Sequence, residues 1–154
     1  MRKPRRGGTD YAMKYDDASW HYGGDFPQDL PIESGATHTG MFVAWALLTG
    51  LAGEMHIVDF PEGLTKLRSR SLTPGKFFLD ECDGKFTDED LNEEGNAFAL
   101  DYFNDFAKGQ YLKDYEATLG NGLESLYHVK DSWENFDLLK PVLDRRLGDW
   151  RGQQ

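Results

Sequence analysis

The sequence has little cysteine, no long apolar run and fewer basic than acidic residues. Cys82 is the single cysteine in 154 residues, which excludes an internal disulfide framework and a cysteine-rich zinc site. The longest apolar run, Met41 to Leu48, is far shorter than the roughly 20 residues that a membrane helix needs. We therefore expect the chain to have no membrane partner.

Positive charge is also scarce. The chain has 17 Lys and Arg residues against 27 Asp and Glu residues, a formal net charge of −10. Nucleic-acid binding requires clustered Lys and Arg that neutralise phosphates, so this balance argues against a nucleic-acid partner. The composition is typical of an acidic cytoplasmic protein.

Four of the 17 basic residues lie within the first six positions of the chain. Arg2, Lys3, Arg5 and Arg6 precede two glycines, and no apolar run follows them, whereas a secretory signal needs one. We expect residues 1–12 to form a disordered basic extension, with Met13 as an alternative start of translation. Residues 13–151 are then expected to form a single globular helical domain.

Apolar spacing predicts a mainly α-helical, single compact domain of several short helices. The strongest pattern runs from Thr37 to Leu51 and is apolar on nearly every face, as expected for a central helix. Gly95 is predicted to break a helix, and Pro141 to kink or restart one. No segment shows sustained alternation with a period of two, and Leu123 to Val129 could form either a helical turn or a strand. Further helices are predicted over 60–71, 73–83, 87–94, 97–106, 111–119 and 131–150.

Residues 14–36 are rich in aromatic side chains and interrupted by glycine and proline. We interpret them as an ordered aromatic N-terminal loop with one short helical turn from Asp16 to His21, which Asp17 would cap. A second aromatic cluster spans residues 127–136. The two clusters either pack together at the margin of the core or present a recognition surface.

No established catalytic motif is present, and we expect no cofactor. The metalloprotease, nucleophile-elbow, P-loop and dinucleotide-binding patterns are all missing. The histidines His21, His38, His56 and His128 include no pair at the spacing of a helical zinc site. A metal site would have to be assembled from separate segments, and its candidates are Asp16, Asp17, His21 and His38. The simpler interpretation is that Asp17 caps a turn and His21 forms a hydrogen bond within the aromatic loop.

Several longer segments carry a resemblance. They are Tyr15 to Pro27, Ala36 to Phe42, Glu93 to Phe98 and Tyr127 to Trp133. These segments resemble an uncharacterised bacterial family of small acidic cytoplasmic proteins. That family is similar to the immunity proteins encoded beside polymorphic toxins. The resemblance implies an immunity protein and supplies no established catalytic residue.

The leading hypothesis is therefore an immunity-type protein that binds and neutralises a cognate, basic bacterial toxin domain. Carboxylates would steer the encounter, and aromatic side chains would slow dissociation. An alternative is a metal-dependent hydrolase or other small enzyme that uses the Asp and His candidates above. A third possibility is a homodimer joined through the apolar seam from Phe136 to Trp150. The candidate partner-binding residues are Trp20, His21, Asp25, Asp88, Glu89, Asp90, Glu93 and Glu94.

Overall fold

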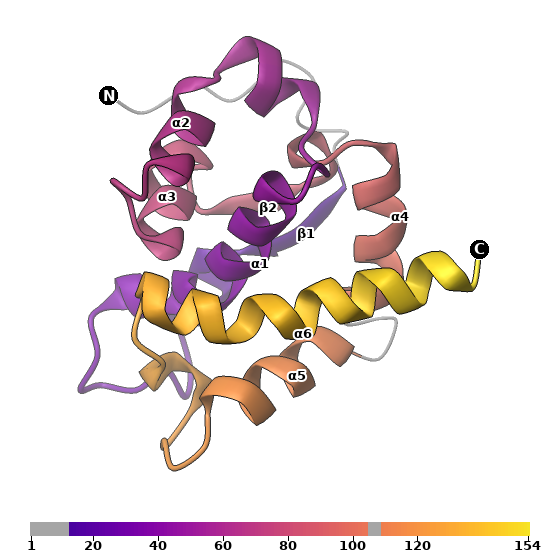
Figure 1. Cartoon of the computed structure of the whole chain (residues 1–154). Helices are drawn as coiled ribbons and strands as arrows, with labels where there is room; N and C mark the ends of the chain where they lie inside the picture. The colour runs from indigo at the N-terminus through magenta and orange to yellow at the C-terminus, as the bar shows by residue number, and fades with distance from the viewer. Residues whose placement is uncertain (1–12, 105–108) are drawn as a thin grey trace.

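The computed structural model describes residues 13–104 and 109–154. The predicted basic extension over residues 1–12 lies outside the described residues, as does the end of the helix predicted over 97–106. The described chain is a compact, mainly helical domain with one small sheet (Figure 1), so the predicted fold class is confirmed.

Six α-helices lie within the described residues, joined by short 3₁₀ turns and one π turn. The helices are α1 (Thr37–Leu48), α2 (Glu62–Arg68), α3 (Pro74–Glu81), α4 (Glu93–Tyr102), α5 (Gln110–Leu119) and α6 (Trp133–Gly152). The short turns are η2 (Ala18–His21), η3 (Ile32–Ala36), η4 (Met55–Asp59), η5 (Asp88–Asp90) and η7 (Leu126–His128).

Helix α1 passes through the middle of the molecule (Figure 1) and is the centre of the core, as its sequence predicts. Every residue from Thr37 to Leu47 is buried. Helix α3 packs along it at very short range, since a Cβ at Gly40 would lie 2.7 Å from the carbonyl oxygen of Pro74. The absence of a side chain at this position lets the two helices touch. Thr73 caps α3 with its side chain, as the Thr-Pro pair predicts.

The sheet was not predicted. Strand β1 (Lys14–Asp17) pairs antiparallel with β2 (Lys85–Thr87), with Asp16 opposite Phe86 and an irregular register between Lys14 and Asp16. Strands of three and four residues are too short to show a period of two in the sequence. The sheet closes one side of the core, where the Tyr15 and Phe86 rings lie 4.7 Å apart.

The prediction of a helix break at Gly95 is wrong. Residues 88–90 form the single turn η5, Asn92 then caps α4, and the helix runs through Gly95. The Asn92 side chain accepts a hydrogen bond from the Gly95 amide at 2.8 Å. A Cβ at Gly95 would lie 2.9 Å from the Leu51 carbonyl oxygen, so glycine here serves close packing rather than helix termination.

Helix α6 continues through Pro141 as one twenty-residue element, so the predicted restart does not occur (Figure 1). Pro141 is exposed, and water can solvate the carbonyl group that its missing N–H leaves unpaired. The apolar residues on both sides hold the helix on the core: Phe136, Leu139, Leu143 and Leu147 are all buried.

The N-terminal segment has the ordered aromatic character that was predicted. Asp17 caps the turn η2 by accepting a hydrogen bond from the Ser19 amide at 3.0 Å. Further along, the Phe26 ring packs 5.0 Å from the Tyr127 ring of η7. The two aromatic clusters therefore meet, as the structural alternative proposed.

Among residues 13–104 and 109–154, no helix combines the length and apolar character required to cross a membrane.

Candidate functional site

Three short elements bring Asp16, His21 and His38 together. Asp16 belongs to β1 and is buried, because the strand pairing turns its side chain inward. The cap at Asp17 folds the chain back through η2 and returns His21 to the carboxylate of Asp16. His38 lies in the first turn of α1 and is 2% exposed.

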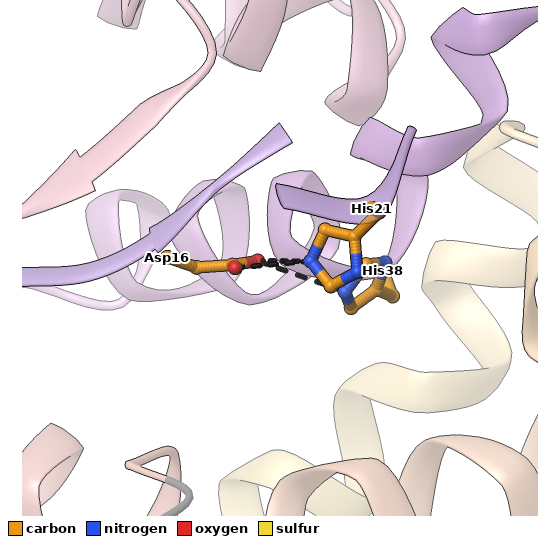
Figure 2. A group of neighbouring side chains, drawn as sticks. All are labelled: Asp16, His21 and His38. Atoms are coloured by element: carbon orange, nitrogen blue, oxygen red, sulfur yellow. Dashed lines mark hydrogen bonds and ion pairs between the residues drawn. The ribbon is translucent and has the colours of Figure 1, made fainter. Parts of the chain in front are cut away.

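The carboxylate of Asp16 faces both imidazole rings (Figure 2). His21 Nε2 lies 3.0 Å from each oxygen of Asp16, and His38 Nε2 lies 3.6 Å from Oδ2. The two imidazole rings meet edge to face, with centroids 4.5 Å apart. One nitrogen from each ring and one carboxylate oxygen all lie within 4.8 Å of one another.

Neighbouring side chains hold this group in place. His21 Nδ1 lies 2.8 Å from the Tyr127 hydroxyl, and the Thr39 hydroxyl donates a short hydrogen bond to Asp16 Oδ2. The Tyr111 hydroxyl donates to the backbone carbonyl of His38. Partners of this kind fix the orientation of rings and carboxylates in functional sites.

Burial sets the charge states. It lowers the pKa of His38 to about 4, although the nearby Asp16 carboxylate acts in the opposite direction. Burial by itself would raise the pKa of Asp16, but the hydrogen bond from His21 and the two imidazoles outweigh it and lower this pKa. At neutral pH the site therefore holds a carboxylate and a neutral His38, which has a free lone pair on one ring nitrogen.

The fourth metal candidate, Asp17, is not part of this group. Its carboxylate accepts hydrogen bonds from the amide and hydroxyl groups of Ser19 and from Lys14 Nζ. This is the capping role that the simpler interpretation proposed. His21, by contrast, contacts both the aromatic residue Tyr127 and the carboxylate of Asp16.

A cavity of about 550 Å³ lies next to the group without being lined by Asp16, His21 or His38. Tyr127 connects the two, because it lines the cavity and its hydroxyl contacts His21. The cavity wall also contains Thr37, Lys76 and Asp131. Both imidazole rings therefore pack against Tyr127 and lie outside the cavity lining.

The predicted partner-binding residues separate into surface and interior positions. Trp20 is 59% exposed, and Asp25 and Glu93 are exposed as well. Glu94 is exposed and forms a two-pronged ion pair with Arg151 at 2.8 and 2.9 Å. Asp88 and Glu89 are half-buried.

Asp90 is the exception, because its exposure is 0%. One carboxylate oxygen lies 2.8 Å from His56 Nε2, and the other accepts a hydrogen bond from the Thr87 amide. Asp90 thus belongs to the interior and cannot contact a partner in this conformation. His21 is also largely enclosed, with a side chain 20% exposed.

Sequence reasoning missed Tyr127 and Thr39 as members of the group. Thr39 follows His38 directly, and Tyr127 precedes His128, so both lie in the segments that carry the family resemblance. His128 is separate from the group: it lies 2.9 Å from the Ser125 hydroxyl and 3.1 Å from Asp29. The exposed pair Ile57 and Val58, in η4, was also missed.

Residues 14–129 match the family described as Domain of unknown function (DUF7832). The matched range includes Asp16, His21, His38 and Tyr127 and ends before α6. No curated protein and no solved structure matches the chain. Because the match spans well over half of the sequence, the chain belongs to the DUF7832 family.

Proposed function

We propose that the chain is an immunity-type protein that binds and neutralises a cognate basic toxin domain of a bacterium. The observation that carries the proposal is an exposed apolar pair in a segment whose only acidic or basic charges, histidine aside, are carboxylates. Ile57 is 56% exposed and Val58 is 65% exposed, and the stretch from Glu54 to Glu62 contains three acidic residues and no Lys or Arg. The proposal includes a cytoplasmic location.

The backbone places a second acidic segment beside this pair. The Gly53 amide donates to the Asp90 carbonyl at 3.0 Å, and η4 packs against η5. We call the resulting surface the acidic face and define it by Glu54, Ile57, Val58, Glu89 and Glu93.

The chemistry of this face matches a basic protein partner. Interfaces combine an apolar centre that loses water with a polar rim, and the exposed Ile57 and Val58 side chains supply such a centre. The rim of carboxylates, together with a net charge of −10, attracts a basic domain over a Debye length of about 8 Å at physiological salt. Charge then sets the association rate, and the apolar contact sets the dissociation rate.

The experiment is co-expression with the product of the neighbouring gene, tested as the toxin. The unmodified chain should restore growth and form a complex that weakens as salt rises. The double variant I57S/V58S should lose rescue through faster dissociation, and E54K/E93K should slow association. Leu138→Ser is the matched control, because Leu138 is also 57% exposed but lies on α6.

Failure of the unmodified chain to bind the toxin domain or to relieve its toxicity would contradict the proposal. Full rescue by both double variants, with circular dichroism showing that they are folded, would keep an immunity function but reject the acidic face. Loss of rescue in L138S would place the interface on α6 instead.

A second candidate is a metal-dependent hydrolase, and the convergence of Asp16, His21 and His38 favours it. Against it, the large cavity is lined by none of the three residues. The test is hydrolysis of a generic phosphodiester or ester with added Zn²⁺. Turnover that disappears in D16N and with a chelator would support this candidate, and equal rates with and without the protein would reject it.

A further inference from the structure

His38 is a buried imidazole without an adequate hydrogen bond. Its side chain is 3% exposed, and Nδ1 has no partner among the described residues. Its Nε2 lies 3.6 Å from Asp16 Oδ2, which is longer than a hydrogen bond. A buried polar group in this state requires an explanation, and an ion or a water molecule is the usual one.

The two distances from the imidazole nitrogens to Asp16 are close to the separation between two ligands of one metal ion. In a tetrahedral site with bonds of about 2.0 Å, neighbouring ligand atoms lie about 3.3 Å apart. The measured distances to Asp16, 3.0 Å from His21 and 3.6 Å from His38, lie on either side of that value. All three ligand atoms lie within 4.8 Å of one another, so one ion can contact all three once the two rings adjust.

We propose that Asp16, His21 and His38 bind one divalent transition-metal ion, with zinc as the expected occupant. Two imidazole nitrogens and one carboxylate oxygen are ligands that Zn²⁺ accepts and that Mg²⁺ does not favour. The ion takes the place of the proton now shared between His21 and Asp16. It gives His38 Nε2 a closer partner than Asp16 Oδ2, and it leaves the N–H on His38 Nδ1 without a partner among the described residues.

The contacts around His21 and Asp16 suit this occupant. Metal-bound histidines usually donate their second N–H to an oxygen, and His21 Nδ1 lies 2.8 Å from the Tyr127 hydroxyl. Thr39 holds the carboxylate of Asp16 through its hydroxyl. Three protein ligands leave one position for water or an external group, as in zinc sites that are not purely structural. His21 is the most exposed of the three, at 20%, and offers the route from solvent.

The two other groups of possible ligands fit less well. The first consists of His56, Cys82 and Asp90, and all three are buried, so this group has no partly exposed member that could admit an ion. In the second, Asp29 and Glu124 have side chains 66% and 86% exposed, so two of its three possible ligands are not held by packing. The group around Asp16 is both partly accessible and held in place.

The experiment uses the whole chain, stripped of metal with EDTA and then freed of the chelator. Titration with Zn²⁺ in a calorimeter should show one site per chain, and Zn²⁺ should raise the melting temperature where Mg²⁺ does not. Co²⁺ should give the visible absorption bands of a four- or five-coordinate ion. Asp16→Asn and His21→Gln should each weaken zinc binding by about tenfold or more, and Tyr127→Phe should weaken it less.

The control is His128→Gln, which alters a histidine in the exposed group and should bind zinc as the unmodified chain does. Absence of saturable zinc binding in the stripped, unmodified chain overturns the proposal, whatever the variants do. Undiminished binding in a folded D16N or H21Q also overturns it, as does loss of binding in H128Q alone. None of these outcomes depends on the toxin, so the metal site and the immunity function fail independently.

Discussion

Asp114 joins three helices through one carboxylate. It lies on α5, accepts a hydrogen bond from the Tyr102 hydroxyl of α4 at 2.6 Å, and forms a two-pronged ion pair with Arg146 of α6. Burial by itself would raise the pKa of Asp114, but the hydrogen bonds from Arg146, Tyr102 and Gln110 outweigh it and lower this pKa. The ionised form is therefore the one that stabilises the fold.

Replacing Asp114 with Asn should lower the free energy of unfolding by about 2 kcal/mol at neutral pH, since charged hydrogen bonds are lost. Because the folded pKa is lowered, the unfolded state binds the proton more readily, and stability rises with pH. The contribution is present above the ordinary pKa of an aspartate and is lost as pH falls toward the lower folded value. The difference between variant and unmodified chain should thus shrink in acid, as urea unfolding at several pH values would measure.

Asp137→Asn is the matched control for this prediction. Asp137 also forms a two-pronged pair with an arginine, Arg70, but both side chains are about half exposed. An exposed pair contributes little because water and salt screen it. Equal losses in the two variants would show that burial does not strengthen the Asp114 contacts.

Single residues also show where sequence reasoning about the site succeeds and stops. Asp16, His21 and His38 were identified as metal candidates because Asp and His recur in distinctive segments. Their convergence depends on β1 and on the turn after it. The strand pairing and the contact with Tyr127 join residues that are distant in sequence, so local residue spacing does not predict them. Asp17 was predicted to cap its turn, and it does. Asp90 could not be told from its acidic neighbours, because a carboxylate that pairs inside the core looks the same in sequence as an exposed one.

At the scale of elements, the contact between α1 and α3 depends on Gly40. A Cβ there would lie 2.7 Å from the Pro74 carbonyl and 2.9 Å from Gly75 Cα, both backbone atoms that cannot rotate away. Gly40→Ala should therefore destabilise the fold by about 1–3 kcal/mol, the usual cost of overpacking. Denaturant unfolding would show this as a lower midpoint with an unchanged slope.

Gly148→Ala provides the opposite expectation in the same experiment. Gly148 lies within α6, and a Cβ there meets nothing within 4 Å. Alanine should stabilise this helix by about 0.5–1 kcal/mol, because glycine loses more backbone freedom on folding. If both alanine variants moved stability in the same direction, the close contact at Gly40 would not be the reason for its effect.

Elements were predictable where a local signal specifies them. Thr73 followed by proline indicates the start of α3, and the apolar spacing from Phe136 to Leu147 indicates α6. Both signals lie within the helix or next to it. The break expected at Gly95 failed because the residue serves a contact with Leu51, 44 positions away in sequence. The sheet was missed for a related reason: β1 and β2 are specified by their pairing across the fold and not by a pattern within each strand.

At the scale of the whole molecule, the apolar seam of α6 is already used within one chain. Phe136, Leu139, Leu143 and Leu147 are at most 3% exposed, so they cannot also form the dimer contact that the sequence suggested. The large apolar side chains that remain exposed include Ile57 and Val58 of the acidic face. The carboxylates of Glu54 and Glu93 on this face would repel the same carboxylates of a second copy.

We therefore expect the purified chain to be monomeric over a wide range of concentrations at physiological salt. Light scattering coupled to size exclusion should give the mass of one chain, 17.5 kDa, at each concentration. High salt screens the carboxylates and is the condition most favourable to self-association through Ile57 and Val58. A dimer that appears only in high salt and is absent in I57S/V58S would show that the acidic face can self-associate. It would also show that electrostatic repulsion prevents this association at physiological salt. A dimer at low salt would contradict the expected repulsion and would assign this face, or another, to self-association.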